Sequence, residues 1–318
     1  MQVTRFNPGR ALVAAAATVA FAIPSTATAA EQADLRVEGA GQPLAAATYL
    51  TDTARIKTAS SSTCKGSGDV KTVQGPTALG LLWSAAGLNS RLRPLAVSDE
   101  FDFGLLVCGI SSFVGGDTAY WLYKVDHKSP EVGADQFPLE GGEEVLWFFS
   151  DTAANVNTGD ELVLQAPARA KPGGSVAVRV WAYDSAGKRS PAAGARVVGE
   201  DEATTDAQGR ATIATPERGT LRLRAERSAD IPSQTASVCI TAKPSCPSRH
   251  GKRIFGTAKA DRIAGTKGPD TVASGAGADR VSVRGGGRDT VRCGKGRDRV
   301  SADRSDSVGR DCEVVKRG

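Results

Sequence analysis

The pattern of apolar and polar residues predicts a chain built mainly of short β-strands. In the first third, alternating or strongly apolar runs predict strands at residues 35–38, 48–57, 101–110, 120–125 and 145–149. Residues 77–87 instead carry apolar side chains at helical spacing, with Thr77 as N-cap and Gly87 as C-cap. One helix among several short strands predicts a compact α+β domain over residues 31–151.

A second group of short strands is predicted within residues 159–241. Residues 175–181 and 220–225 alternate cleanly, and shorter runs at 195–199 and 210–213 lie between turn-forming segments. Short strands at this spacing predict a β-sandwich. A linker rich in Pro, Ser and Lys follows at residues 242–253.

The C-terminal segment repeats a short motif built around aspartate. The aspartates recur at intervals of 8 to 10 residues: Asp261, Asp270, Asp279, Asp289, Asp298 and Asp306. A β-branched aliphatic residue stands two positions after each: Ile263, Val272, Val281, Val291, Val300 and Val308. A glycine stands two positions before each of the four interior aspartates: Gly268, Gly277, Gly287 and Gly296. A repeated supersecondary unit over residues 254–318 is therefore predicted.

This repeat resembles the nonapeptide of RTX, or haemolysin-type, calcium-binding proteins. The resemblance implies a parallel β-roll in which each coil uses two nonapeptides, so that alternate repeats stack on one side. It also implies calcium binding by these six aspartates and four glycines. Glycines permit tight turns whose carbonyls approach a cation, aspartate supplies a hard oxygen ligand, and the aliphatic residue fills the interior.

The residue after each aspartate differs between the two sides of such a roll. One side carries Arg262, Arg280 and Arg299, and the other carries Thr271, Thr290 and Ser307. Two hypotheses follow for the turns. Either they bind calcium with an affinity of about 10⁻⁴ M, best on the hydroxyl side, or they are degenerate and nearby guanidinium groups neutralise the carboxylates. The arginine row is either an anion-binding surface for an acidic cell-envelope polymer or a solvated charged face.

The N-terminus and the charge distribution indicate an exported protein. Residues 1–30 combine Arg5 and Arg10, an apolar run and Ala27-Thr28-Ala29, as in a secretory signal peptide. No later stretch is apolar enough to span a membrane. Residues 251–318 carry a net charge of +7, whereas the whole chain carries only +5. We therefore expect a secreted protein, extracellular or associated with the cell surface, with a basic tail.

Six cysteines in an exported chain favour disulfides over metal ligands. Many pairings are open in principle. Sequence order and the predicted boundaries suggest Cys64–Cys108, Cys239–Cys246 and Cys293–Cys312.

Two weaker resemblances concern the first two domains. Residues 120–151, with the upstream helix, resemble bacterial domains related to the transcobalamin C-terminal domain. The matching positions are Trp121, Tyr123, Val125, Leu139, Gly142, Glu143 and Val145. This resemblance implies a β-grasp-like domain and, as an alternative function, an extracellular carrier of a small, cobalamin-like ligand. Trp121, Tyr123 and Trp147 would form the ligand surface, although strand-pairing or core aromatics fit the same pattern. Residues 204–233 resemble bacterial Ig-like and carboxypeptidase-regulatory-like domains.

The sequence contains few residues or motifs that are typical of enzyme active sites. The chain has two histidines, and no nucleophile elbow, HExxH helix or phosphate-binding loop occurs. We predict a mainly β, non-enzymatic interaction protein that does not bind nucleic acid. Its order is a β-grasp-like α+β domain, an Ig-like β-sandwich and a C-terminal parallel β-roll.

Overall fold

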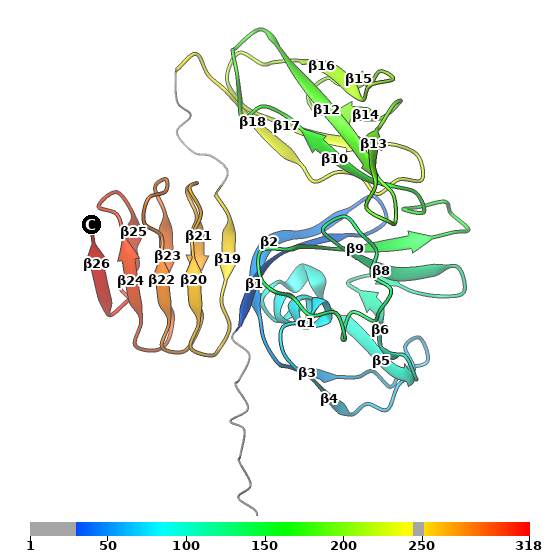
Figure 1. The fold of residues 1–318 in the computed structure, drawn as a ribbon, viewed down its shortest axis with the longest axis vertical. Coiled ribbons are helices and arrows are strands. Elements are labelled where there is room, and N and C mark those ends of the chain that lie inside the picture. The colour runs from blue at the N-terminus through cyan, green and yellow to red at the C-terminus, as the bar shows by residue number, and fades with distance from the viewer. Residues whose placement is uncertain (1–29, 244–250) are drawn as a thin grey trace, which may run out of the picture.

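The computed structural model describes residues 30–243 and 251–318, which form a mainly β structure with one α-helix among them (Figure 1). Residues 1–29 of the predicted signal peptide and Cys246 lie outside the described residues. Three groups of strands are visible: the N-terminal domain around the helix, a two-sheet body above it, and a stack of short strands at the side.

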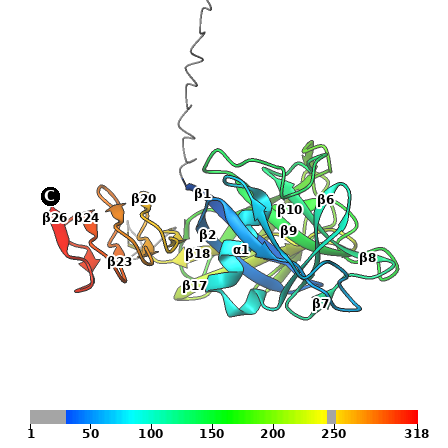
Figure 2. The same ribbon diagram turned by 90° about the horizontal axis from the view of Figure 1, so that it is seen from below.

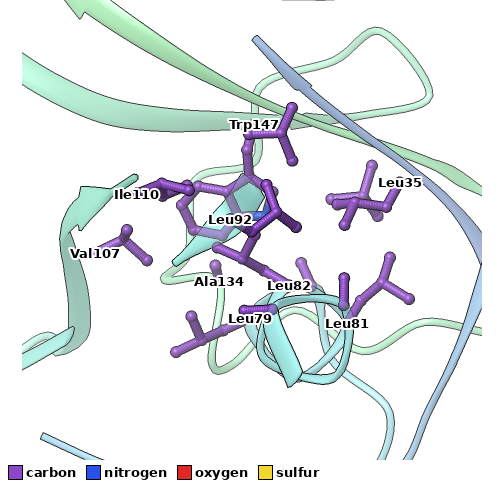
Figure 3. Close-up of a cluster of buried hydrophobic side chains, with 14 of the residues drawn as sticks. Leu35, Leu79, Leu81, Leu82, Leu92, Val107, Ile110, Ala134 and Trp147 are labelled. Atoms are coloured by element: carbon purple, nitrogen blue, oxygen red, sulfur yellow. The ribbon is translucent and has the colours of Figure 1, made fainter. Parts of the chain in front are cut away.

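The N-terminal domain folds a sheet around helix α1 (Ala78–Leu88). Its sheet strands are β1 (Glu31–Glu38), β2 (Pro43–Thr51), β8 (Ala119–Val125) and β9 (Glu144–Asp151). The Thr77 hydroxyl accepts the N–H of Gly80 (3.0 Å), as its N-cap role predicts. The predicted C-cap, Gly87, is wrong. The helix continues through Leu88, and the N–H of the cap residue Asn89 donates to Ala85. Leu79, Leu81 and Leu82 pack with Leu35 and Trp147 in the core (Figure 3).

The single strand expected at residues 101–110 is a hairpin with an additional short strand. The strands are β5 (Leu95–Phe101), β6 (Gly104–Ile110) and β7 (Phe113–Val114). The chain turns at Asp102 and Phe103, and Gly104 adopts φ +124° directly after the turn. Sequence alternation did not distinguish this turn from a continuous strand, because Phe101 and Phe103 are both exposed rather than buried. A smaller hairpin pairs β3 (Ala54–Lys57) with β4 (Val70–Val73), and a 3₁₀ turn, η1 (Ser90–Leu92), follows α1.

Residues 161–240 form two sheets around one hydrophobic core. The first contains β10 (Glu161–Gln165), β12 (Ser175–Tyr183), β13 (Arg189–Pro191) and β16 (Arg210–Ala214). The second contains β11 (Arg169–Ala170), β14 (Arg196–Val198), β15 (Glu202–Thr204), β17 (Gly219–Glu226) and β18 (Ala236–Ile240). Inward residues such as Val178, Val180, Leu221 and Leu223 alternate with outward ones, which is how each sheet buries one face.

The C-terminal segment is a parallel roll of short strands. One side stacks β19 (Arg253–Phe255), β21 (Thr271–Ala273), β23 (Thr290–Arg292) and β25 (Ser307–Val308). The other stacks β20 (Arg262–Ala264), β22 (Arg280–Ser282), β24 (Arg299–Ala302) and β26 (Val314–Arg317). Alternate repeats therefore share a side, as predicted. Val283 lies in the one ten-residue interval of the repeat, between Asp279 and Asp289, and packs in the roll core.

The roll is joined edge to edge to the N-terminal domain. Strand β19 pairs in parallel with β2, so one eight-stranded sheet runs β25-β23-β21-β19-β2-β1-β9-β8 (Figures 1 and 2). Leu50 of β2 belongs to the roll core together with Ile254 and Ile263. The N-terminal domain thereby covers the first coil of the roll, which would otherwise expose an apolar end.

Buried charges lie where the N-terminal domain meets the sandwich. Arg36 bonds Glu38 (3.2 Å) and Glu161 (3.3 Å), and all three side chains are at most 4% exposed. His127 Nδ1 lies 3.0 Å from Glu161 Oε1, and its ring stacks on Tyr183. Lys124 donates to the carbonyl oxygens of residues 183 and 184. These contacts orient the two bodies through charged groups that sequence patterns do not reveal.

Candidate calcium turns and arginine face

The six repeat aspartates lie inside the roll, where their carboxylates bridge successive coils. All six are at most 6% exposed. The N–H of Asp261 donates to Asp279 Oδ1 (2.9 Å), and that of Asp279 donates to Asp298 Oδ1 (2.8 Å). On the other side, the N–H of Asp270 donates to Asp289 (2.7 Å), whose own N–H donates to Asp306 (3.0 Å). Each side of the roll therefore carries a ladder of carboxylate–amide bonds.

Three further acids continue these ladders at the far end of the roll, and the repeat pattern did not identify them. Glu313 Oε2 accepts the N–H of Asp298 (2.8 Å), so it occupies the place of a next aspartate. Asp311 accepts the N–H groups of Cys293 and Gly294, and Asp303 accepts that of Gly285. The sequence gives one sign of these acids: acidic residues continue for about one coil after the repeat motif ends.

For the first five aspartates, the residue four positions earlier distinguishes satisfied from unsatisfied carboxylates. Thr257 donates to Asp261 through its N–H (2.6 Å) and its hydroxyl, and Thr266 does the same for Asp270. Glycine occupies this position before Asp279, Asp289 and Asp298. In these three, the buried Oδ2 atom has no hydrogen-bond partner. Burying a carboxylate oxygen without a hydrogen-bond partner lowers the stability of the fold, and a bound cation would offset this loss.

The predicted glycines lie where adjacent turns touch. Gly277 and Gly296 adopt φ +124° and +147°, and a Cβ on Gly296 would lie 1.5 Å from the carbonyl oxygen of Gly277. On the hydroxyl side, Gly287 donates to the carbonyl oxygen of Gly268 (3.4 Å), and a Cβ on Gly287 would meet Pro269 at 2.7 Å. Only glycine permits this close stacking.

The residues present fit a calcium ion in part. Three buried carboxylate oxygens without partners supply hard ligands, and desolvation raises the pKa of Asp289 to about 6. Desolvation likewise raises the pKa of Asp261 and of Asp279. Within residues 30–243 and 251–318, no three His, Cys, Asp or Glu side chains come close enough together to hold a metal ion. Backbone carbonyls of the turns would have to complete any site.

Comparison with known proteins agrees with this geometry. Residues 255–286 match the RTX calcium-binding nonapeptide repeat. Residues 107–151 match a domain of unknown function (DUF4430), which covers strands β8 and β9 and the end of β6. No curated protein and no solved structure shows significant similarity to the chain. The chain thus carries RTX-type calcium-binding repeats. The transcobalamin-like and Ig-like resemblances are not confirmed.

The arginines of the predicted row are brought together on one sheet. Arg262 pairs in register with Arg280, and Arg280 pairs with Arg299. All three are exposed. The hypothesis that guanidinium groups neutralise the repeat carboxylates is wrong for this structure, because the carboxylates face inward to backbone amides and no ion pair among the described residues links them to arginine.

The predicted aromatic ligand surface lies mostly within the core. Trp121 and Trp147 are 3% exposed, and Trp121 Nε1 donates to the carbonyl oxygen of Phe113 (2.9 Å). Tyr123 is half-buried, stacks on Trp147 and donates its hydroxyl to the carbonyl oxygen of Val132 (2.7 Å). The edges of these rings contribute to a groove of about 450 Å³, whose exposed walls include Phe103 and Leu122.

Two of the three predicted disulfides are confirmed. Cys64–Cys108 ties the loop after β3 to β6, and Cys293–Cys312 joins the last coils of the roll. The pairing predicted for Cys239 involves a residue outside the described part of the chain. Disulfides together with RTX-type repeats point to an extracellular protein. Within the described residues, α1 is not long or apolar enough to cross a membrane, and no other helix meets that requirement.

Proposed function

We propose that this chain is a secreted, non-enzymatic interaction protein whose C-terminal roll is stabilised by calcium. The N-terminal segment, residues 1–30, would direct its export. The supporting observation is the set of buried, unpartnered Oδ2 atoms of Asp279, Asp289 and Asp298, each in a turn that begins with glycine. The calcium-binding character of the matched repeats agrees with this proposal.

Calcium is expected to act as a stabilising ligand of a roll that is already largely assembled. The carboxylate–amide ladders hold successive coils together without metal. A ligand present at 100 times its Kd stabilises the state it binds by about 2.7 kcal/mol per site. With a Kd of about 10⁻⁴ M, typical of extracellular modules, 10 mM calcium would therefore raise the Tm of the roll measurably.

The test is calcium titration of the full chain by calorimetry and by thermal unfolding. The variant Asp289→Asn removes an ionised carboxylate whose Oδ2 has no partner, and we expect it to weaken calcium binding about tenfold or more. Asp270→Asn is the matched control on the same ladder. In the wild type, the Asp270 carboxylate accepts hydrogen bonds from the N–H of Lys252 and the hydroxyl of Thr266. The calcium affinity of this variant should therefore change little.

Two results would contradict the proposal. The wild type could give no heat and no rise in Tm with calcium, or the two variants could lose affinity equally. The second result would show that general negative charge, rather than the unpartnered oxygens, attracts the cation.

The carrier alternative rests on the groove beside Tyr123. Its volume of about 450 Å³ falls in the range of small-molecule sites, which is about 300–1,000 Å³. An absorption spectrum of cobalamin altered by the full chain would favour this alternative.

A further inference from the structure

The arginine row of the roll is a regular array of exposed cations. Arg262, Arg280 and Arg299 occupy equivalent positions on β20, β22 and β24. Neighbouring strands lie about 4.8 Å apart, so the guanidinium groups recur at about that interval along the roll axis. None of the ion pairs found within residues 30–243 and 251–318 involves any of the three.

The roll cannot neutralise this row with its own acids. All nine carboxylates in residues 251–318 accept backbone N–H groups of the roll, most of them from a neighbouring coil. No ion pair joins two residues of this segment. Its two printed ion pairs, Lys252–Asp34 and Lys259–Asp52, use acids of the N-terminal domain. The fold thus directs its negative charge inward and leaves the basic side chains outside.

Small side chains stand beside the arginine row on the same face. Alternation along each strand places Ala264, Ser282 and Ser301 on the face of Arg262, Arg280 and Arg299, with Ile263, Val281 and Val300 pointing inward. Ala264 and Ser282 are exposed, and Ser301 is partly so. The row of arginine side chains is therefore flanked by a parallel row of small side chains along the roll axis. The equivalent positions of the opposite sheet carry Arg253, Thr271, Thr290 and Ser307, so no row of arginines forms there.

We propose that this row docks a linear polycarboxylate, an acidic polysaccharide with one carboxylate on each sugar ring. The guanidinium fork matches a carboxylate in bidentate geometry. One sugar ring separates successive carboxylates by close to the strand spacing, whereas a single bridging oxygen holds successive phosphates of a polyphosphate closer together than the strands. The inference rests on the proposed function and names the partner class of that interaction protein. Exposed single contacts are weak and are screened by salt, so affinity arises from three contacts made together.

The experiment measures binding of the full chain to polygalacturonate, which carries carboxylates, at low ionic strength, with inorganic polyphosphate as the comparison polymer. The test variant is the triple Arg262→Gln, Arg280→Gln, Arg299→Gln. The control triple is Arg288→Gln, Arg297→Gln, Arg304→Gln, which removes the same charge from exposed turn positions of the roll. We expect the row triple to weaken binding of polygalacturonate about tenfold or more, and the control triple to weaken it about twofold. A tenfold loss for polyphosphate without such a loss for polygalacturonate would overturn the assignment of the partner as a polycarboxylate.

A competition experiment tests the spacing. Trigalacturonate should displace the bound polygalacturonate, whereas the monomer at equal carboxylate concentration should not. Equal losses in the two triple variants would overturn the proposal in favour of net charge, and so would the absence of polymer binding by the wild type.

Calcium titration of the same variants separates this inference from the proposed function. The row triple should retain the calcium response, since its side chains face away from the carboxylates. Polymer binding without any calcium response would remove the calcium part of the proposed function and leave the arginine surface standing.

Discussion

At the scale of single residues, the first position of each turn distinguishes turns that look alike in the repeat pattern. Thr257 and Thr266 donate to the aspartate of their own turn, whereas glycine before Asp279, Asp289 and Asp298 leaves one oxygen of each carboxylate unpartnered. The aspartate spacing could be predicted from the sequence. The sequence also shows threonine or glycine four positions earlier, but it does not show that these hydroxyls lie within bonding distance of the carboxylates.

The glycines of the turns are expected to differ sharply in their tolerance of a side chain. We predict that Gly296→Ala disrupts the roll, because its Cβ would lie 1.5 Å from the carbonyl oxygen of Gly277 and its φ is +147°. Gly285→Ala, at φ +78° with no heavy atom within 4 Å of the new Cβ, should cost only about 1 kcal/mol.

Hydrogen exchange of the full chain measures both glycine variants. In Gly296→Ala, amides of β22 to β26 should lose protection while the sandwich keeps its own. Similar protection in the two variants would show that the turns can move apart and that close stacking does not require glycine.

At the scale of elements, the sequence predicted strands better than the turns between them. Clean alternation located β12 and β17, since each buries one face against the sandwich core. The turn at residues 102–103 was missed because the phenylalanines beside it are exposed, which violates the rule that apolar residues mark buried positions. The contacts between elements could not be predicted either: no sequence pattern indicates that His127 bonds the buried Glu161.

The contact between β8, β9 and β10 should make stability depend on pH. The hydrogen bond that His127 donates to Glu161 raises the pKa of His127, and the negative charges of Glu161 and Glu144 raise it further. Desolvation and the charge of Arg36 act in the opposite direction. A raised pKa in the folded state means that the stabilisation is complete below about pH 6.5, the unfolded value, and is lost as the pH rises through the folded value. Desolvation also raises the pKa of Glu144. Ionisation of Glu144 therefore also lowers the stability of the folded state as the pH rises, but at a lower pH than deprotonation of His127.

We therefore expect the Tm of the N-terminal domain and sandwich to fall between pH 6 and pH 8. His127→Gln should remove most of this slope while lowering the Tm at pH 6 by a few degrees, which corresponds to about 1 kcal/mol. Thermal unfolding at several pH values, without calcium, measures both. An unchanged slope in the variant would assign the pH dependence to other groups.

At the scale of the whole molecule, the predicted order of three parts does not describe how they are joined. The repeat pattern predicted the roll, its parallel strands and its two sides. It contained nothing about the parallel pairing of β19 with β2, because that contact joins positions about 200 residues apart in the chain. The pairing makes the sheet of the N-terminal domain continuous with one side of the roll, and Leu50 closes the apolar interior of the first coil.

This junction implies that the N-terminal domain stabilises the roll. Repeat structures are held by contacts between neighbouring repeats, and a terminal repeat without a cap exposes its core. Leu50→Ala leaves a cavity beneath Ile254 and Ile263, and a buried Leu→Ala change costs about 2–5 kcal/mol. We predict that in the full chain this variant exposes the amides of β19 to β22 to exchange. Calcium should restore part of the protection by binding farther along the stack.

The matched control is Leu223→Ala, which removes an equally buried leucine from the sandwich core. It should lower protection in β12 and β17 and leave the roll unchanged. If Leu50→Ala loses protection only in β1 and β2, the roll is stable by its own carboxylate ladders and the continuous sheet is a passive attachment. If the loss spreads from β19 outward, the N-terminal domain is the structural start of the roll, and the arginine row depends on it for its alignment.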